Sequence, residues 1–146
     1  MASGQLKRQE GSSGETKQRS AEVQARVDVY LINGDGEDHP FVYGTITTRV
    51  DSGTETTMYN KSSSQAEIVA PGMPITMNNF VKMSGWADKF YVHAKLYDYD
   101  YLSPDDEIAN GTATFVVRSG GSSGAEYITG QDGKIQVRVQ WYDVNP

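Results

Sequence analysis

Residues 90–97 have the sequence Phe-Tyr-Val-His-Ala-Lys-Leu-Tyr, and this stretch decides the fold class. Its even positions hold Phe, Val, Ala and Leu, whereas its odd positions hold Tyr, His, Lys and Tyr. Successive side chains of a strand point to opposite faces of a sheet, so this period of two predicts a strand with one buried face. Residues 135–142 repeat the pattern, with Ile, Val, Val and Trp alternating with Gln, Arg, Gln and Tyr.

The chain around these two stretches is divided into similar short segments by turn-forming residues. Asp51-Ser52-Gly53 and Pro71-Gly72 are turns by composition, and Asp132-Gly133 is typical of a hairpin. No window shows a helical repeat longer than two turns, and the Gly-rich residues 120–124 are expected to be flexible. These features predict an all-β protein, an antiparallel eight-stranded β-sandwich or jelly roll. The expected strands lie at about residues 26–32, 41–50, 56–60, 66–69, 74–80, 90–97, 113–117 and 135–142.

Residues 1–22 differ from the rest in composition, and we expect them to form a disordered N-terminal arm. They hold four basic and three acidic residues, and Leu6 is their one large apolar residue after Met1. Such a segment buries too little apolar surface to offset the entropy of ordering it. The β-sandwich domain is therefore expected at residues 23–146. The arm lacks the apolar core of a secretory leader, so we expect cytoplasmic localisation or leaderless export.

The composition also excludes several functional classes. The 146 residues carry a net charge of −6 and include no cysteine, so disulfides, thiolate metal sites and cysteine nucleophiles are excluded. The acidic balance argues against nucleic acid as a partner, because phosphates favour clustered Lys and Arg. No apolar run approaches the length of a transmembrane helix. Since the arm carries +1, the domain carries −7.

The densest group of acidic residues lies at 98–107, where five of ten residues are Asp or Glu. Asp98 and Asp100 are two residues apart at a strand end, so both carboxylates are expected on one side. A turn at Ser103-Pro104 can return Asp106 toward them. A pair of like charges about 4 Å apart repels by roughly 1 kcal/mol in water and about 4 kcal/mol near a protein surface. A hard divalent cation with oxygen ligands offsets such repulsion, so the segment is a candidate calcium site.

A second interpretation of the same segment stays open. It is an acidic, solvated turn, or the first turn of a helix with Ser103 as N-cap and Pro104 at the first helical position. In the calcium interpretation, Asp35, Glu37 and Asp38 would lie at the same end of the sandwich and add their charge to the site.

One part of this segment has a family resemblance. Within residues 95–111, an apolar strand runs into Asp-Tyr-Asp, with a further Asp after five residues and then Ile and Gly. This arrangement resembles the third calcium-binding loop of C2 domains. The acidic first, third and ninth positions of that loop correspond here to Asp98, Asp100 and Asp106.

A shorter match lies near the N-terminal side of the domain. Residues 38–43, Asp-His-Pro-Phe-Val-Tyr, are similar to the Asp-Pro-Tyr-Val stretch that follows the first calcium loop of C2 domains. The resemblance implies Asp38 as a further ligand, although His39 interrupts the motif. The family's other first-loop aspartate has Ile32 in its place, and Asp35 is the nearest substitute.

The C2 resemblance implies an eight-stranded, C2-like sandwich that binds calcium and then anionic lipid. Tyr101 and Leu102 at the loop tip would insert into a membrane or stack on a partner, with Tyr99 beside them. Trp86 lies in a Gly-containing turn, where it is expected to cap one end of the sandwich or to act as a further contact residue.

A second resemblance covers more of the chain and says less about activity. Residues 40–46, Pro-Phe-Val-Tyr-Gly-Thr-Ile, are similar to the start of an uncharacterised β-sandwich domain of grass and bacterial proteins. That domain sometimes occurs beside ribosome-inactivating toxin domains. The turn at 71–75 and the strand at 90–96 follow in the same order. No motif of N-glycosidase chemistry is present, so the resemblance implies an accessory domain.

The sequence predicts a binding module in preference to an enzyme. It contains no Gly-x-Ser-x-Gly elbow and no His-Glu-x-x-His motif, and its two histidines are isolated from each other. Two alternatives to calcium-dependent binding stay open. One is a metal-independent surface for carbohydrate or protein, formed by exposed tyrosines. The other is a structural subunit that self-assembles through open sheet edges, so the oligomeric state is left open.

Overall fold

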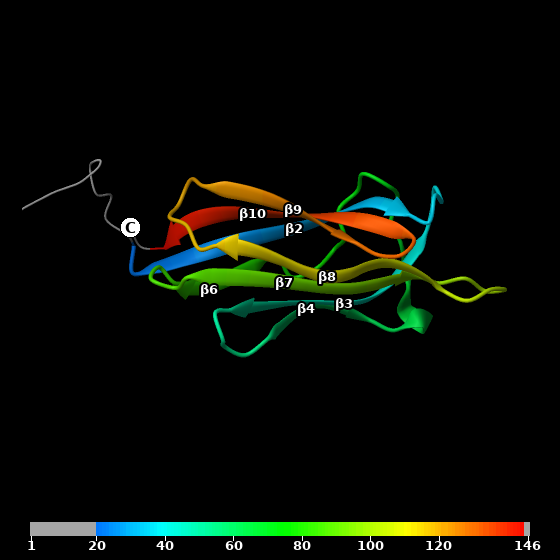
Figure 1. Ribbon diagram of the computed structural model, residues 1–146, viewed down its shortest axis with the longest axis horizontal. Helices are drawn as coiled ribbons and strands as arrows, with labels where there is room; N and C mark the ends of the chain where they lie inside the picture. Colours follow the sequence, from blue (N-terminus) through cyan, green and yellow to red (C-terminus); the bar gives the residue numbers. More distant parts are fainter. Residues whose placement is uncertain (1–19, 145–146) are drawn as a thin grey trace, which may run out of the picture.

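The computed structural model describes residues 20–144, which form two packed antiparallel sheets (Figure 1). One sheet has the strand order β6-β2-β10-β9, and the other has the order β4-β3-β7-β8, with the short β5 pairing with β3. The predicted all-β antiparallel sandwich is therefore confirmed. Its strands are β2 (Glu22–Gly34), β3 (Phe41–Val50), β4 (Thr56–Lys61), β5 (Glu67–Ile68), β6 (Phe80–Ser84), β7 (Lys89–Asp98), β8 (Asp106–Val116), β9 (Ser123–Thr129) and β10 (Gly133–Val144), with one 3-10 turn, η1 (Ser63–Gln65).

The alternating stretches that predict the fold form the centre of the sandwich. β7 pairs with β3 and β8, and β10 pairs with β2 and β9. Their apolar faces meet in a single core, in which the rings of Phe90 and Trp141 are in edge-to-face contact at 5.8 Å. Edge-to-face aromatic pairs contribute roughly 0.5–1.5 kcal/mol beyond the area they bury. The period of two is therefore the pattern that joins the two sheets.

The described part of the chain has nine strands, one more than predicted, and β9 is the strand that the sequence did not indicate. Its side chains do not alternate, and Ile128 is the one buried residue in it. β9 forms because the β10 backbone offers it a hydrogen-bonding edge, along which Gly124 pairs with Val139. Gly124 also lets the strand approach the ring of Phe115. The glycine run that predicted flexibility therefore leads into an edge strand.

The strand predicted at 74–80 is wrong in its position. Residues 72–79 run beside β2 with irregular backbone hydrogen bonds, and the regular strand β6 follows only at Phe80. Pro71 and Pro74 explain the delay, because proline donates no hydrogen bond and interrupts a ladder. The first strand is longer than expected and begins at Glu22. The predicted arm, residues 1–22, lies outside the described residues except for its last three positions.

The connections between strands gather at two opposite ends of the sandwich (Figure 1). Residues 35–40, 99–105 and 130–132 lie at one end, which we call the acidic end. Residues 51–55, 85–88 and 117–122 lie at the other end. β7 joins the two ends, because it starts next to Trp86 and finishes at Asp98. No helix in residues 20–144 is long and apolar enough to cross a membrane.

Candidate metal centre

Asp98 is the buried anchor of the acidic end. It is the last residue of β7 and continues the buried face of that strand, so its side chain is 0% exposed. Its Oδ1 accepts a hydrogen bond from the backbone N–H of Phe41 at 2.9 Å. Its Oδ2 is buried and has no hydrogen-bond partner among the described residues. Because an unpaired buried carboxylate oxygen is costly, this atom is a position where a cation would be stabilised.

The connection from β2 to β3 brings two further carboxylates to Asp98. Asp35 and Gly36 both have left-handed backbone conformations, with φ angles of 59° and 72°. The turn is secured by the N–H of Gly36, which donates to the side chain of Asn33 at 2.8 Å, and by the N–H of Asp35, which donates to the carbonyl of Asp132 at 2.9 Å. This reversal places Asp35 and Glu37 against the end of β7.

The connection from β7 to β8 is organised by Asp105. Its Oδ1 accepts the N–H of Asp100 at 3.0 Å, and its Oδ2 accepts the hydroxyl of Tyr43 on β3. These two bonds close a loop that places Asp106, the first residue of β8, beside Asp100. The alternative of a helical first turn at Ser103 is wrong, because no helix forms here and β8 begins directly after the loop.

Five carboxylates converge at this end. One oxygen of each lies within 4.8 Å of an oxygen of every other, and we call this group the acidic cluster. It contains four of the predicted residues and one that the predicted set left out. Its members are Asp35, Glu37, Asp98, Asp100 and Asp106.

The structure corrects the predicted ligand set at one position. Asp38 does not belong to the acidic cluster and is exposed, whereas Glu37 takes the place assigned to it. Neighbouring residues of a non-helical chain direct their side chains to different sides, so a shift of one residue exchanges a ligand for a surface group. The motif match to Asp-His-Pro could not reveal this, because the turn at Gly36 sets the direction of the residues that follow.

The crowding raises the pKa of three carboxyl groups. Burial raises the pKa of Asp98 to about 6, aided by Glu37, which can hydrogen-bond only to the protonated form of Asp98 and repels its ionised form, and opposed by the Phe41 N–H. The pKa of Asp35 is raised, chiefly by hydrogen bonding to Asp106. For Asp106, hydrogen bonding to Asp35 lowers the pKa, but hydrogen bonding to Asp100, desolvation and repulsion outweigh it, and the pKa is raised. The raised pKa values show that ionisation of these carboxyl groups is unfavourable in the metal-free protein, because the five groups repel one another.

The predicted contact residues separate between the two ends. Tyr101 and Leu102 are 85% and 92% exposed at the tip of the loop that carries Asp100, and Tyr99 lies beside them. Trp86 lies at the opposite end of β7, so it is not part of the same surface. The expectation that Trp86 caps the sandwich is wrong, because its side chain is 69% exposed.

The molecule is thus an antiparallel β-sandwich with one acidic, carboxylate-lined end. No family model and no curated protein matches the chain. Among solved structures, it matches a chain in the crystal structure of the Cry23Aa1 and Cry37Aa1 binary protein complex, with a TM-score of 0.58, 13% identity and coverage of 82% of this chain and 97% of that one. At this identity the match shows a shared fold.

C2 domains are also among the structural matches. The C2A domain of plant extended synaptotagmin 1 gives a TM-score of 0.44 at 12% identity, covering 89% of this chain and 100% of that one. Human GIVD cytosolic phospholipase A2 also gives 0.44 at 12% identity, covering 88% of this chain and 18% of that one.

Proposed function

We propose that the protein is a non-catalytic, calcium-binding module whose acidic end engages a partner surface when the ion is bound. The observation that carries this proposal is the acidic cluster with the unpartnered Oδ2 of buried Asp98 at its base. A set of carboxylates that only faced solvent would not place a buried oxygen without a donor next to four other acids. A bound cation removes both the desolvation cost and the repulsion.

The size of the acidic cluster favours calcium over magnesium. Calcium binds six to eight oxygens at about 2.3–2.6 Å, so two ligands on opposite sides of the ion are about 5 Å apart. Magnesium requires about 2.0–2.1 Å, which limits that separation to about 4.2 Å. The oxygens of the acidic cluster lie within 4.8 Å of one another, and its five carboxylates suit the six to eight oxygen ligands of calcium, whereas magnesium usually takes one or two carboxylates and keeps several waters.

Calcium titration by calorimetry tests the metal site. We expect heat of binding for the wild type and an affinity at least tenfold lower for Asp100→Asn, because a charged ligand becomes neutral. Asp38→Asn is the matched control, since it removes the same charge from the same end outside the acidic cluster. Absence of binding by the wild type at millimolar calcium, or equal loss in both variants, would contradict the proposal.

The proposed partner surface is an anionic membrane. Without cation, the acidic end repels such a surface, whereas each bound calcium adds two positive charges beside the exposed Tyr101 and Leu102. These side chains project at the loop tip, where a large apolar group can enter the interfacial region.

Vesicle sedimentation tests the membrane step. We expect vesicles with phosphatidylserine to bind the protein in calcium and not in chelator, and Leu102→Ser to weaken binding about tenfold while leaving the calcium affinity unchanged. Val116→Ser, at an exposed apolar residue of β8, is the control. Binding that persists in chelator would count against the calcium-dependent step.

A further inference from the structure

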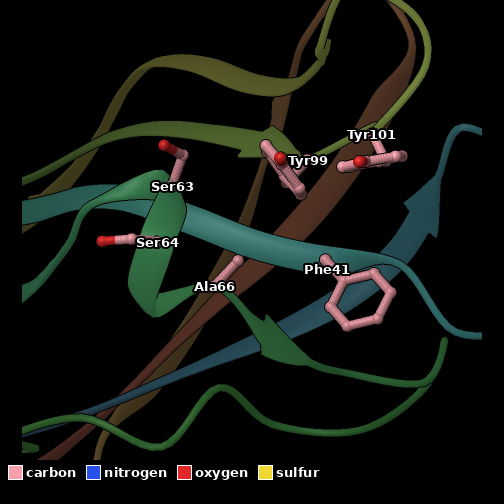
Figure 2. Close-up of a pocket in the computed structure, with 6 residues that line it drawn as sticks. All are labelled: Phe41, Ser63, Ser64, Ala66, Tyr99 and Tyr101. Atoms are coloured by element: carbon pink, nitrogen blue, oxygen red, sulfur yellow. The ribbon is translucent and has the colours of Figure 1, made fainter.

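We propose that a second site beside the acidic cluster binds an uncharged pyranose ring through Phe41, Tyr99 and Tyr101. The site goes beyond the calcium proposal, because it involves none of the cluster side chains and requires no metal. It is a surface pocket of about 500 Å³ between η1 and the loop that follows β7 (Figure 2). Its lining residues are Phe41, Ser63, Ser64, Ala66, Tyr99 and Tyr101.

Alternation along one extended segment creates the two neighbouring sites. In residues 98–101 the order is Asp-Tyr-Asp-Tyr, and the two aspartates join the acidic cluster whereas the two tyrosines line the pocket. The N–H of Tyr99 donates to the carbonyl of Phe41 at 2.8 Å, which holds the end of β7 and the start of β3 together. The metal side and the pocket side are therefore opposite faces of the same backbone.

The other wall of the pocket is a rigid local structure. η1 begins with a capping box, in which the N–H of Ser62 donates to Oε1 of Gln65 at 3.0 Å. This turn and Ala66 form one wall of the pocket, and Figure 2 shows Ala66 and Phe41 on the lower side with Tyr99 and Tyr101 above them, while the Ser64 hydroxyl points away from the rings. The pocket volume is within the usual range of about 300–1,000 Å³ for small-ligand sites.

The aromatic rings of the pocket have unused faces, unlike four other tyrosines of the described residues. Arg138 covers the ring of Tyr30 at 4.1 Å, Arg49 covers Tyr91 at 4.4 Å, and Lys134 covers Tyr127 at 5.0 Å. Tyr97 is stacked on Tyr43. Among residues 20–144, no ring or cation is stacked on Phe41, Tyr99 or Tyr101. The pocket therefore concentrates the free aromatic faces at this end.

The chemistry of the lining selects an uncharged sugar. A pyranose offers apolar C–H faces that stack on aromatic rings and hydroxyl groups that bond to polar edges. The pocket supplies three rings together with the hydroxyls of two tyrosines and of Ser63, whereas the hydroxyl of Ser64 is hydrogen-bonded to that of Ser62 at 3.0 Å. Within the described part of the chain no charged side chain lines it, so these residues offer no ion pair to a charged ligand. The neighbouring acidic cluster also disfavours an anion in the pocket.

Saturation-transfer NMR of the full chain in chelator tests the site with cellotriose, maltotriose, mannotriose, xylotriose and chitotriose as probes. We expect at least one trisaccharide to bind and Tyr101→Ala to weaken it at least tenfold. Tyr127→Ala is the matched control, because Tyr127 is also an exposed tyrosine but its ring is covered by Lys134. Tyr99→Ala provides a second variant, and circular dichroism checks that each variant is folded.

The sugar ring can be presented by a free glycan or by a glycolipid headgroup, so phosphatidylcholine vesicles with and without glucosylceramide form a second arm. Binding only to glucosylceramide vesicles assigns the site to a glycolipid, and binding to a soluble trisaccharide assigns it to a free glycan. No binding in either arm, equal binding to plain phosphatidylcholine, or binding that Tyr101→Ala leaves unchanged would overturn the proposal. Because all measurements are made in chelator, failure here is distinct from failure of calcium binding.

Discussion

Asp98→Asn is expected to raise the free energy of unfolding of the metal-free protein at pH 7.5 by about 3 kcal/mol, although it removes the buried residue of the acidic cluster. The reason is the pKa of Asp98, which burial raises from its ordinary 3.8 to about 6. Each pKa unit corresponds to about 1.4 kcal/mol of differential stability, so the ionised side chain destabilises the folded state by about that total. Asparagine keeps an acceptor for the Phe41 N–H and offers an amide donor at the unpartnered position.

The pH dependence follows from the direction of this shift. Below about pH 4 Asp98 is protonated in both folded and unfolded protein, and the wild type carries no penalty. Between pH 4 and 6 the unfolded chain releases its proton first, so wild-type stability falls, and above pH 6 the full cost is present. The difference between Asp98→Asn and wild type is therefore expected to be small at pH 4 and largest above pH 6.

Urea unfolding in chelator at pH 4, 6 and 7.5 measures this effect, with Asp38→Asn as the exposed control. In the same series, calcium is expected to stabilise the wild type at pH 7.5 and to stabilise Asp98→Asn much less. If Asp98→Asn is less stable than the wild type by the same amount at every pH, Asp98 stabilises the fold through its hydrogen bond to Phe41. In that case its ionised form does not destabilise the metal-free protein.

Gly44→Ala is expected to destabilise the protein by roughly 3–5 kcal/mol, although the substitution removes no contact. Gly44 lies in β3 with a φ angle of 126°, a conformation that residues with a side chain rarely adopt. A Cβ atom added there would lie 2.1 Å from the carbonyl oxygen of Lys95 and 3.0 Å from the Cα of Leu96. Both obstacles are backbone atoms of β7, so β3 and β7 would have to separate.

Gly72→Ala is the matched control for this substitution. Gly72 also has a positive φ angle, 87°, but an added Cβ atom meets no atom within 4 Å. Its replacement is expected to cost about 1–2 kcal/mol, the usual penalty for left-handed backbone. Urea unfolding of both variants separates backbone conformation from close approach. Equal losses would show that the contact between β3 and β7 relaxes without cost.

The sandwich could be predicted because its causes are local in sequence. Alternation at residues 90–97 and 135–142 depends on the pleat of a single strand, and burial of one face requires a second sheet. β9 was not predicted because it forms through backbone hydrogen bonds to β10, and such bonds require no alternation of apolar and polar side chains. The strand predicted at 74–80 was wrong because the composition of this segment is typical of a strand, but Pro71 and Pro74 interrupt the regular backbone hydrogen bonds before Phe80.

The acidic end shows the same division. The spacing of Asp98, Asp100 and Asp106 was sufficient to bring them together, because a strand end and a short turn control where all three point. The choice of Glu37 over Asp38 depended on the left-handed turn at Asp35 and Gly36, in a connection that precedes β7 by more than 50 residues in the sequence.

Alternating residues therefore specified the strands, the buried faces and the presence of a concentrated acidic loop. The tertiary structure decided which carboxylates converge, that Asp98 is buried with an unpartnered oxygen, and that Trp86 is exposed. It also decided which aromatic rings keep a free face. These outcomes depend on the packing of one sheet on the other and on the direction of each loop. Both are determined by contacts between residues that are distant in sequence, which a local sequence pattern does not contain.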